Sequence, residues 1–225
     1  MERNVIVTGA SGGLGTAVVD AFKREGYRII ATVLPGSGDH VEAADDVYEV
    51  NLADEDAVLE FSKEIQMQYG DVDALILLVG GFAMGDIETT SANDIKQMVE
   101  LNFFSAYHMV RAFLPGMKKA DHGQFLLVGA KPAAEKKHRK SILAYALSKG
   151  MLMDFAQVLG EECEGTKLRT HVFVPSIIDT PANRAAMPDA DFAAWVNPEE
   201  IAEAMHYALN NPSLKDMTFK LYGDS

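Results

Sequence analysis

The sequence predicts an α/β fold, a doubly wound parallel sheet of about seven strands built by a single domain over residues 1–225. Three observations predict it. Short apolar, β-branched runs alternate with helix-like segments along the chain. Most of these runs have no polar face, as in strands that are covered by helices on both sides. Neither an internal repeat nor a long polar linker divides the chain.

The expected strands are bounded by turn residues and follow one another along the whole sequence. They cover residues 4–8, 28–34, 47–51, 74–79, 124–128, 170–174 and 217–222. Between them, apolar residues at 14, 17, 18, 21 and 22 form one helix face that ends before Gly26, and Asn197 with Pro198 is typical of a helix start. Ligands of such sheets bind at the carboxyl ends of the strands, so we sought chemistry in the residues that follow each strand.

Composition limits the partners and the compartment. The formal charge is −13, from 33 acids and 20 bases, which disfavours nucleic acids and anionic membranes as partners. The longest apolar run, at residues 74–84, is too short to span a bilayer, and the charged first residues do not form a secretion signal. Cys163 is the only cysteine, so no intramolecular disulfide can form. We therefore expect a cytoplasmic protein with no membrane and no nucleic-acid partner.

A glycine-rich loop, Thr-Gly-Ala-Ser-Gly-Gly-Leu-Gly at residues 8–15, joins the first expected strand to the first helix. Glycines let the backbone turn tightly and approach a pyrophosphate, whose charge is favoured by a helix N-terminus. An ordinary glycine-rich turn would have the same composition, but the position between first strand and first helix favours a dinucleotide site. The candidate binding residues of this loop are Gly9, Ser11, Gly13, Leu14 and Gly15.

Tyr145 and Lys149 form a second candidate motif. They are four residues apart in a helix-like segment, so their side chains lie on one helix face. An ammonium beside a phenol stabilises the phenolate, and we expect it to lower the tyrosine pKa enough for proton exchange with a substrate near neutral pH. A half-buried tyrosine with a solvated lysine would show the same spacing. The glycine loop upstream favours the catalytic interpretation.

Together, these motifs resemble the short-chain dehydrogenase/reductase family, whose TGxxxGxG loop matches residues 8–15 and whose Tyr-x3-Lys pair matches Tyr145 and Lys149. The resemblance covers essentially the whole chain. It implies a Rossmann-like fold, an NAD(P) cofactor and a small-molecule substrate. It also implies a homodimer or homotetramer that pairs through the tyrosine helix and its neighbour.

The resemblance assigns roles to further residues. Asn102 matches the helix asparagine that holds a water in the proton relay to the lysine, and no metal ligand is expected. Lys149 is also expected to bind the nicotinamide ribose. Besides Lys149 and the glycine loop, the residues expected to contact the cofactor are Asn51, Leu52, Gly80, Pro175, Ile178 and Thr180.

The pattern departs from the family at Ala130, which stands where family members carry a serine that hydrogen-bonds the substrate carbonyl. Either the substrate does not need this donor, or catalysis has been given up and the chain is a dinucleotide-binding sensor. Dihydropteridine reductases, which also lack the serine, resemble the chain at residues 72–81, 129–131 and 179–195. They reduce a quinonoid C=N system with NADH, and this activity is the alternative to reduction of a simple carbonyl.

Three segments bear on specificity. No acid occurs at residues 33–36, where NAD-selective relatives bind the ribose. Gly12 stands where many NADP-using relatives carry a basic residue that binds the 2′-phosphate. The absence of this basic residue favours NADH. Residues 131–140 carry five bases and one acid, which either attract an anionic substrate or form a solvated loop. The apolar residues of segment 182–195 form either a lid over the substrate or a helical pair packed on the core.

Overall fold

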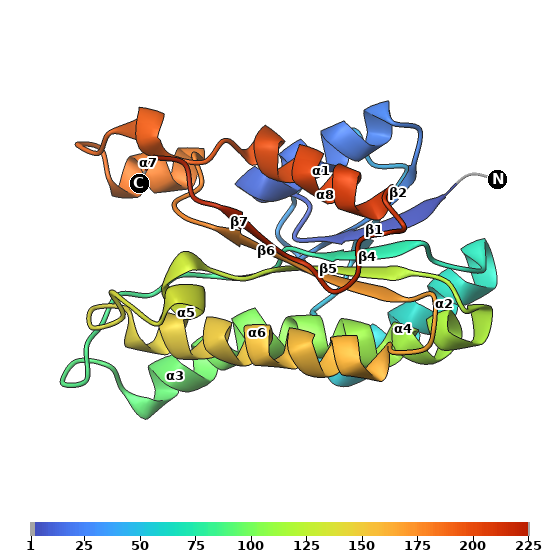
Figure 1. The fold of residues 1–225 in the computed structure, drawn as a ribbon, viewed down its shortest axis with the longest axis horizontal. Coiled ribbons are helices and arrows are strands. Elements are labelled where there is room, and N and C mark those ends of the chain that lie inside the picture. The colour runs from blue at the N-terminus through green and yellow to red at the C-terminus, as the bar shows by residue number, and fades with distance from the viewer. Residues whose placement is uncertain (1–2, 225) are drawn as a thin grey trace.

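The computed structural model describes residues 3–224, which form one sheet of seven parallel strands in the order β3-β2-β1-β4-β5-β6-β7 (Figure 1). The strands are β1 (Asn4–Thr8), β2 (Arg28–Val33), β3 (Asp46–Glu49), β4 (Ala74–Leu77), β5 (Gln124–Val128), β6 (Arg169–Pro175) and β7 (Thr218–Leu221). The strand order reverses between β1 and β4, which is the switch point where doubly wound sheets open a ligand crevice. The predicted fold class is therefore confirmed.

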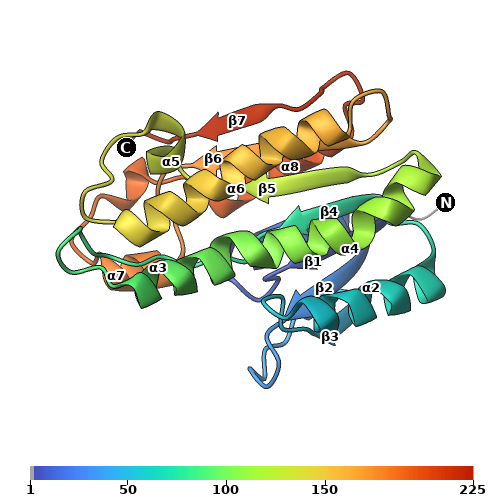
Figure 2. The same cartoon turned by 90° about the horizontal axis from the view of Figure 1, so that it is seen from below.

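Helices cover both faces of the sheet. On one face lie α1 (Gly13–Arg24) and α8 (Pro198–Leu209). The other face is covered by α2 (Glu55–Tyr69), α4 (Ser105–Ala120) and α6 (Leu143–Glu162), which lie side by side in Figure 2. The shorter helical elements are α3 (Ala92–Val99), the π-helix η1 (Glu100–Phe104), α5 (Lys131–Glu135), α7 (Pro181–Ala186) and the 3₁₀-helix η2 (Phe192–Ala194). Among the described residues, no helix is both long enough and apolar enough to cross a bilayer.

The alternation of strand side chains builds two apolar layers. Val5 and Val7 of β1 pack under α1 and α8, whereas Ile6 between them packs against the helices of the opposite face. All three are fully buried, and burial of one such side chain contributes roughly 1.5–3 kcal/mol. The edge strands β3 and β7 instead alternate between half-buried and exposed residues, because only one face of each is covered.

Four expected strands end earlier in the structure, at Val33, Glu49, Leu77 and Leu221. The amide of Leu78 donates to the Thr8 hydroxyl oxygen at 3.0 Å, and the amide of Val79 reaches the same oxygen at 3.4 Å. The chain therefore leaves the ladder at Leu78 although the apolar run continues. At the other end of the chain, Pro198 begins α8 as expected, and the Asn197 side chain accepts a hydrogen bond from the Glu199 amide.

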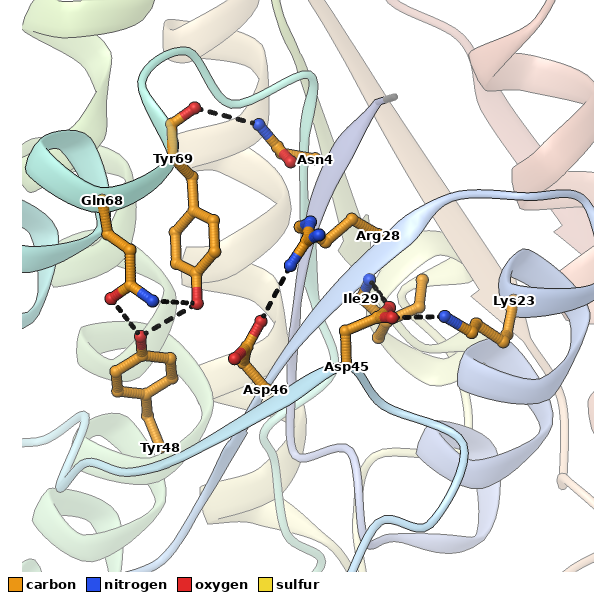
Figure 3. A network of polar contacts seen from close by, with 9 residues as sticks. All are labelled: Asn4, Lys23, Arg28, Ile29, Asp45, Asp46, Tyr48, Gln68 and Tyr69. Carbon is orange, nitrogen blue, oxygen red and sulfur yellow. Dashed lines mark hydrogen bonds and ion pairs between the residues drawn. The ribbon is translucent and has the colours of Figure 1, made fainter. Parts of the chain in front are cut away.

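A polar network holds the β3 edge of the sheet in place (Figure 3). Asp45 pairs with Lys23 of α1 and accepts a hydrogen bond from the Ile29 amide at 2.8 Å. These contacts lower the Asp45 pKa against the opposing effect of partial burial, which is the largest single contribution. Asp46 pairs with Arg28 at 3.4 Å. The network therefore fixes the register of β3 against β2 and lies apart from the residues with predicted catalytic roles.

Candidate active site

The predicted site residues gather at the carboxyl ends of the parallel strands. In Figure 1 this is the end of the sheet where α5 and α7 lie, opposite the N-terminus. Tyr145 and Lys149 occupy the first two turns of α6, and α6 starts soon after the end of β5. The sheet therefore places these two side chains at the edge where ligands of doubly wound folds bind.

Lys149 is held against the end of β5. Its side chain is buried, and Nζ donates a hydrogen bond to the Val128 carbonyl oxygen at 2.8 Å. Burial removes water from the ammonium and lowers the Lys149 pKa to about 8. The solvated lysine considered from the sequence is therefore excluded, and the group titrates close to neutral pH.

Tyr145 is half-buried, and its ring packs edge-on against Phe82 with ring centroids 5.0 Å apart. Burial raises the Tyr145 pKa to about 12. The expectation that Lys149 lowers this pKa is therefore wrong for the structure described, because desolvation of the phenolate outweighs any attraction to the ammonium. A phenol with this pKa is protonated near neutral pH, which is the form that can donate a proton.

Asn102 lies in the π-helix η1 and is fully buried. Its Oδ1 accepts from the Gly81 amide at 2.8 Å, while its Nδ2 donates to the Gly81 carbonyl at 3.1 Å and to Ser148 Oγ at 3.0 Å. The Ser148 hydroxyl in turn donates to the Tyr145 carbonyl oxygen at 2.9 Å. Asn102 thus connects the segment after β4 to the helix that carries the tyrosine and the lysine. No local sequence pattern predicted this π-helix, a feature often found at functional sites.

The glycine loop leaves the space that a pyrophosphate needs. Gly9 has a φ of +62°, and a Cβ on Gly15 would lie 2.2 Å from the Gly9 carbonyl oxygen, so neither position accommodates a side chain. Gly12 caps α1 without any side-chain hydrogen bond, which leaves the first-turn amides available to an anion. These features fit a dinucleotide phosphate at the N-terminus of α1.

Thr180 completes the phosphate end of this site. A Cβ on Gly13 would lie 2.7 Å from the Thr180 side chain, so the segment after β6 comes directly against the glycine loop. The Thr180 hydroxyl accepts from the Asn183 amide and caps α7. Two predicted cofactor contacts that are more than 160 residues apart in sequence are therefore neighbours in space.

A cavity of about 310 Å³ opens beyond the carboxyl ends of β1, β2 and β4. Its lining includes the predicted residues Gly9, Ser11, Asn51, Leu52 and Gly80. It is large enough for part of a nucleotide and lies at the switch point of the sheet.

Asp39 also lines this cavity and was missed from the sequence. Ser11 Oγ donates to Asp39 Oδ2 at 2.8 Å, so the loop after β2 turns back and faces the glycine loop. Asp39 is the first acid after β2 and lies three residues beyond residues 33–36, where an acid was expected.

Some predicted cofactor contacts lie elsewhere. Leu14 and Ile178 pack against the apolar cluster beneath α1 and α8, and Ile178 forms a bridge with Val196. Pro175 is the last residue of β6. Pro175 and Ile178 precede Thr180 by five and two residues in the sequence. None of Pro175, Ile178 and Thr180 lines the cavity.

The end of β5 offers no hydroxyl. Ala130 is buried and caps α5 without a side-chain hydrogen bond. The ring of Phe82, which is 60% exposed, is the aromatic surface next to Tyr145. The surroundings of Tyr145 are therefore more apolar than those of a site with a serine at this position.

Segment 182–195, taken with residues 176–181 before it, combines the two arrangements considered from the sequence. Trp195 is buried and contacts Phe192 with ring centroids 4.8 Å apart, so this end packs on the core. By contrast, α7 has no fully buried residue, as expected of a lid. Arg184 forms a two-point ion pair with Asp179 at 2.6 and 2.7 Å and lies over the Phe192 ring, which ties α7 to both ends of the segment.

Comparison with known proteins is consistent with this geometry. The family described as short chain dehydrogenase matches residues 3–191. An uncharacterised oxidoreductase of Staphylococcus saprophyticus is 25% identical over 94% of this chain and 93% of its own length. A dihydropteridine reductase of Dictyostelium discoideum is 26% identical over 91% of this chain and 87% of its own. The solved structure of ElxO with NADP bound has a TM-score of 0.89 at 17% identity, covering 99% of this chain and 98% of that one, which shows a shared fold.

Proposed function

Because the chain belongs to the short-chain dehydrogenase family and is an oxidoreductase of that family, we propose that it reduces a small carbonyl or imine-like substrate with NAD(P)H. One observation carries the proposal: Tyr145 and buried Lys149 stand on successive turns of α6 at the carboxyl edge of the sheet, with Lys149 fixed to the Val128 carbonyl. The nicotinamide, when bound, supplies the hydride.

In this proposal the protein's own residues hold the cofactor and move the proton. The glycine loop and the first turn of α1 bind the pyrophosphate, while the cavity beside Asn51 and Leu52 takes the adenosine end. Tyr145, protonated because burial raises its pKa to about 12, donates its hydroxyl proton to the substrate. Lys149 contacts the nicotinamide ribose and, when charged, stabilises the phenolate that remains.

We further propose that the protein prefers NADH. Asp39 places a carboxylate at the cavity next to Ser11, where the adenosine ribose would lie. A carboxylate accepts hydrogen bonds from the ribose hydroxyls of NADH but repels a 2′-phosphate. This residue supports the preference more directly than the missing base at Gly12 does.

Reduction of a quinonoid pterin is the second candidate function, and two observations favour it. The buried Ala130 offers no hydroxyl to a substrate carbonyl, and the exposed Phe82 ring beside Tyr145 could stack on a flat ring system. The similarity to the Dictyostelium dihydropteridine reductase agrees with this candidate.

We also propose a homodimer, or a homotetramer built from it. Exposed apolar side chains lie along α6: Leu147, Met151 and Val158 are 44%, 41% and 60% exposed. These residues form an uncovered face on the helix that also carries Tyr145. A second copy of the chain would cover this face.

The first test follows NADH and NADPH absorbance with a panel of aldehydes, ketones, quinones and quinonoid dihydropterin. We expect turnover by the wild type and a loss of about a hundredfold or more in Tyr145→Phe, because this change removes the proton donor. NADH affinity, measured by fluorescence, should stay within about twofold. Tyr207→Phe is the matched control, since Tyr207 is exposed on α8.

Different results identify the alternatives. Turnover that Tyr145→Phe leaves unchanged would contradict the proton-donor role, and tight NADH binding without turnover of any substrate would favour a dinucleotide sensor. Ala130→Ser separates the two catalytic candidates. We expect the added hydroxyl to raise the rate with a simple carbonyl, because it supplies a hydrogen-bond donor to the developing oxyanion, and to have little effect on pterin reduction.

A further inference from the structure

The loop between α5 and α6 has a defined backbone conformation. Lys136 and His138 have φ values of +55° and +54°, the left-handed region that non-glycine residues rarely adopt. The Arg139 guanidinium donates to the carbonyls of Pro132 and Ala133, at 2.8 and 2.6 Å, and so ties the loop back onto α5. Such conformations cost of order 1–3 kcal/mol each and persist where surrounding contacts impose them. The loop is therefore held in a fixed turn.

This turn presents cations to solvent. Lys136, Lys137, His138 and Lys140 are exposed, whereas Arg139 is partly buried by its contacts with α5. Within the part of the chain that the structure describes, no carboxylate pairs with Lys136, Lys137 or Lys140. Cations elsewhere do find acids, as Lys118 does with Glu162. In a protein of net charge −13, three unpaired lysines within five residues form a local positive site.

The cations lie within reach of the reacting centre. Gly85 pairs with both ends of residues 141–143, because its amide donates to the Ser141 carbonyl at 2.8 Å and its carbonyl accepts from the Leu143 amide at 2.9 Å. This anchors the loop at the start of α6. Three steps that can be extended and two helical steps separate Lys140 from Tyr145, so their Cα atoms are no more than about 16 Å apart. A single small molecule can span that distance.

We propose that Lys136, Lys137 and Lys140 bind an anionic group, a carboxylate or a phosphate, that the substrate carries away from the carbon being reduced. The proposal rests on the proposed function and names the substrate class of that same site. The three lysines lie within five residues of one fixed turn, and the net negative charge of the rest of the protein leaves this loop as the attractive site for an anion. Binding of the anionic group then positions the carbonyl beside Tyr145.

The test compares substrates that differ only in the charged group. One pair is 4-oxopentanoate and its methyl ester, which probes a carboxylate. The other pair is S-acetoacetyl-4′-phosphopantetheine and S-acetoacetyl-pantetheine, which probes phosphate. KM and kcat are measured with NADH for the wild type and for the triple variant Lys136→Gln, Lys137→Gln, Lys140→Gln. The control triple variant changes three exposed lysines of other elements by the same charge, Lys63→Gln, Lys119→Gln and Lys215→Gln.

In at least one pair, we expect the wild type to have a lower KM for the anionic member, and the loop variant to reduce this preference about tenfold, mainly through KM. Added salt should weaken the same preference in the wild type. The control variant should behave as the wild type does. The pair that responds identifies carboxylate or phosphate as the group that is bound.

Failure of the anion proposal and failure of the proposed function give different results. If both members of each pair turn over with the same KM in the wild type and in the loop variant, the anion proposal is overturned while the proposed function stands. If neither member of either pair is reduced, equilibrium binding is measured in the Tyr145→Phe variant by NADH fluorescence. If the anionic member binds more tightly, and the three loop substitutions added to Tyr145→Phe abolish this difference, the anion site is supported. Equal binding of the two members would overturn it.

Discussion

At the scale of single residues, desolvation sets the state of the two proposed proton-transfer groups. Burial lowers the Lys149 pKa to about 8 and raises the Tyr145 pKa to about 12, and each shift favours the neutral form of its group. The carbonyl of Val128 is the polar partner that holds Lys149 in this buried position. Near neutral pH, Tyr145 is therefore protonated and Lys149 is still largely charged.

The Lys149 shift predicts how stability depends on pH. In an unfolded chain the lysine pKa is about 10.4, so between pH 8 and 10 the unfolded state binds more protons than the folded state. The free energy of unfolding should then rise with pH, because deprotonation relieves the desolvation cost that the buried ammonium imposes below pH 8. From pH 7.5 to 9.5 the Lys149 contribution is about 2 kcal/mol.

Urea unfolding at these two pH values measures this contribution. We expect the rise to shrink by about 2 kcal/mol in Lys149→Met, and to remain in Lys63→Met, where the lysine is exposed on α2. An equal rise in the wild type and in Lys149→Met would show that the lysine is not desolvated.

Asp39 predicts cofactor selectivity at the same scale. Asp39→Asn keeps an oxygen that can accept from Ser11 but removes the negative charge at the cavity. We expect the kcat/KM ratio of NADH to NADPH to fall about tenfold, since repulsion of the 2′-phosphate is lost. Asp20→Asn, on an exposed position of α1, serves as the control and should leave the ratio unchanged. An unchanged ratio in Asp39→Asn would place the selectivity elsewhere.

At the scale of elements, the Asn102 side chain of the π-helix η1 forms hydrogen bonds both to the segment after β4 and to the first part of α6. The extra residue per turn of η1 brings the Asn102 amide onto both backbone groups of Gly81 and onto Ser148. The loop after β5 is fixed in a comparable way by Arg139 and Gly85. Hydrogen bonds therefore help to position the elements around Tyr145, in addition to apolar packing.

We expect Asn102→Leu to destabilise the protein and slow turnover. The change keeps a similar volume but leaves the Gly81 amide and carbonyl without their partner, at a cost of about 3 kcal/mol. It should also lower kcat more than the affinity for NADH, because the start of α6 loses its connection through Ser148. Asn93→Leu, on an exposed position of α3, is the control in both urea unfolding and steady-state kinetics. Wild-type stability in Asn102→Leu would contradict the positioning role.

At the scale of the whole molecule, the helices that cover the sheet leave apolar side chains of α6 exposed. Leu147, Met151 and Val158 are exposed along α6, and an aromatic group of Phe103, Tyr107 and Phe155 lies between η1, α4 and α6. Within the monomer Leu147, Met151 and Val158 remain 41–60% exposed. Contact with a second copy would bury them on the helix that carries Tyr145.

The dimer proposal predicts that Met151→Asp dissociates the assembly, since an aspartate buried in an apolar interface carries a large desolvation penalty. Light scattering coupled to size exclusion should give a dimer or tetramer for the wild type and a monomer for this variant. Met67→Asp adds the same charge on α2, where the methionine is 82% exposed, and should keep the wild-type mass. A monomeric wild type at micromolar concentration would contradict the proposal.

Local sequence patterns were sufficient to predict the fold class, the number of strands and the location of the glycine loop. The strand at residues 4–8 and the helix that follows it are both found where the apolar periodicity and the glycines predicted them. The Tyr145 and Lys149 pair was also identified, since four-residue spacing places two side chains on one helix face. The ends of strands were predicted less accurately than their positions. At Leu78, for example, the backbone amide donates to the Thr8 hydroxyl of β1 instead of to a backbone carbonyl of the sheet.

Only the tertiary structure decided which distant segments meet and how much water surrounds each group. Thr180 against Gly13, Asp39 beside Ser11 and Asn102 on Gly81 depend on contacts across the sheet that no local pattern encodes. The direction of the Tyr145 pKa shift is a further case. Adjacency in sequence predicted that the ammonium would lower it, whereas burial, a property of the packed molecule, raises it.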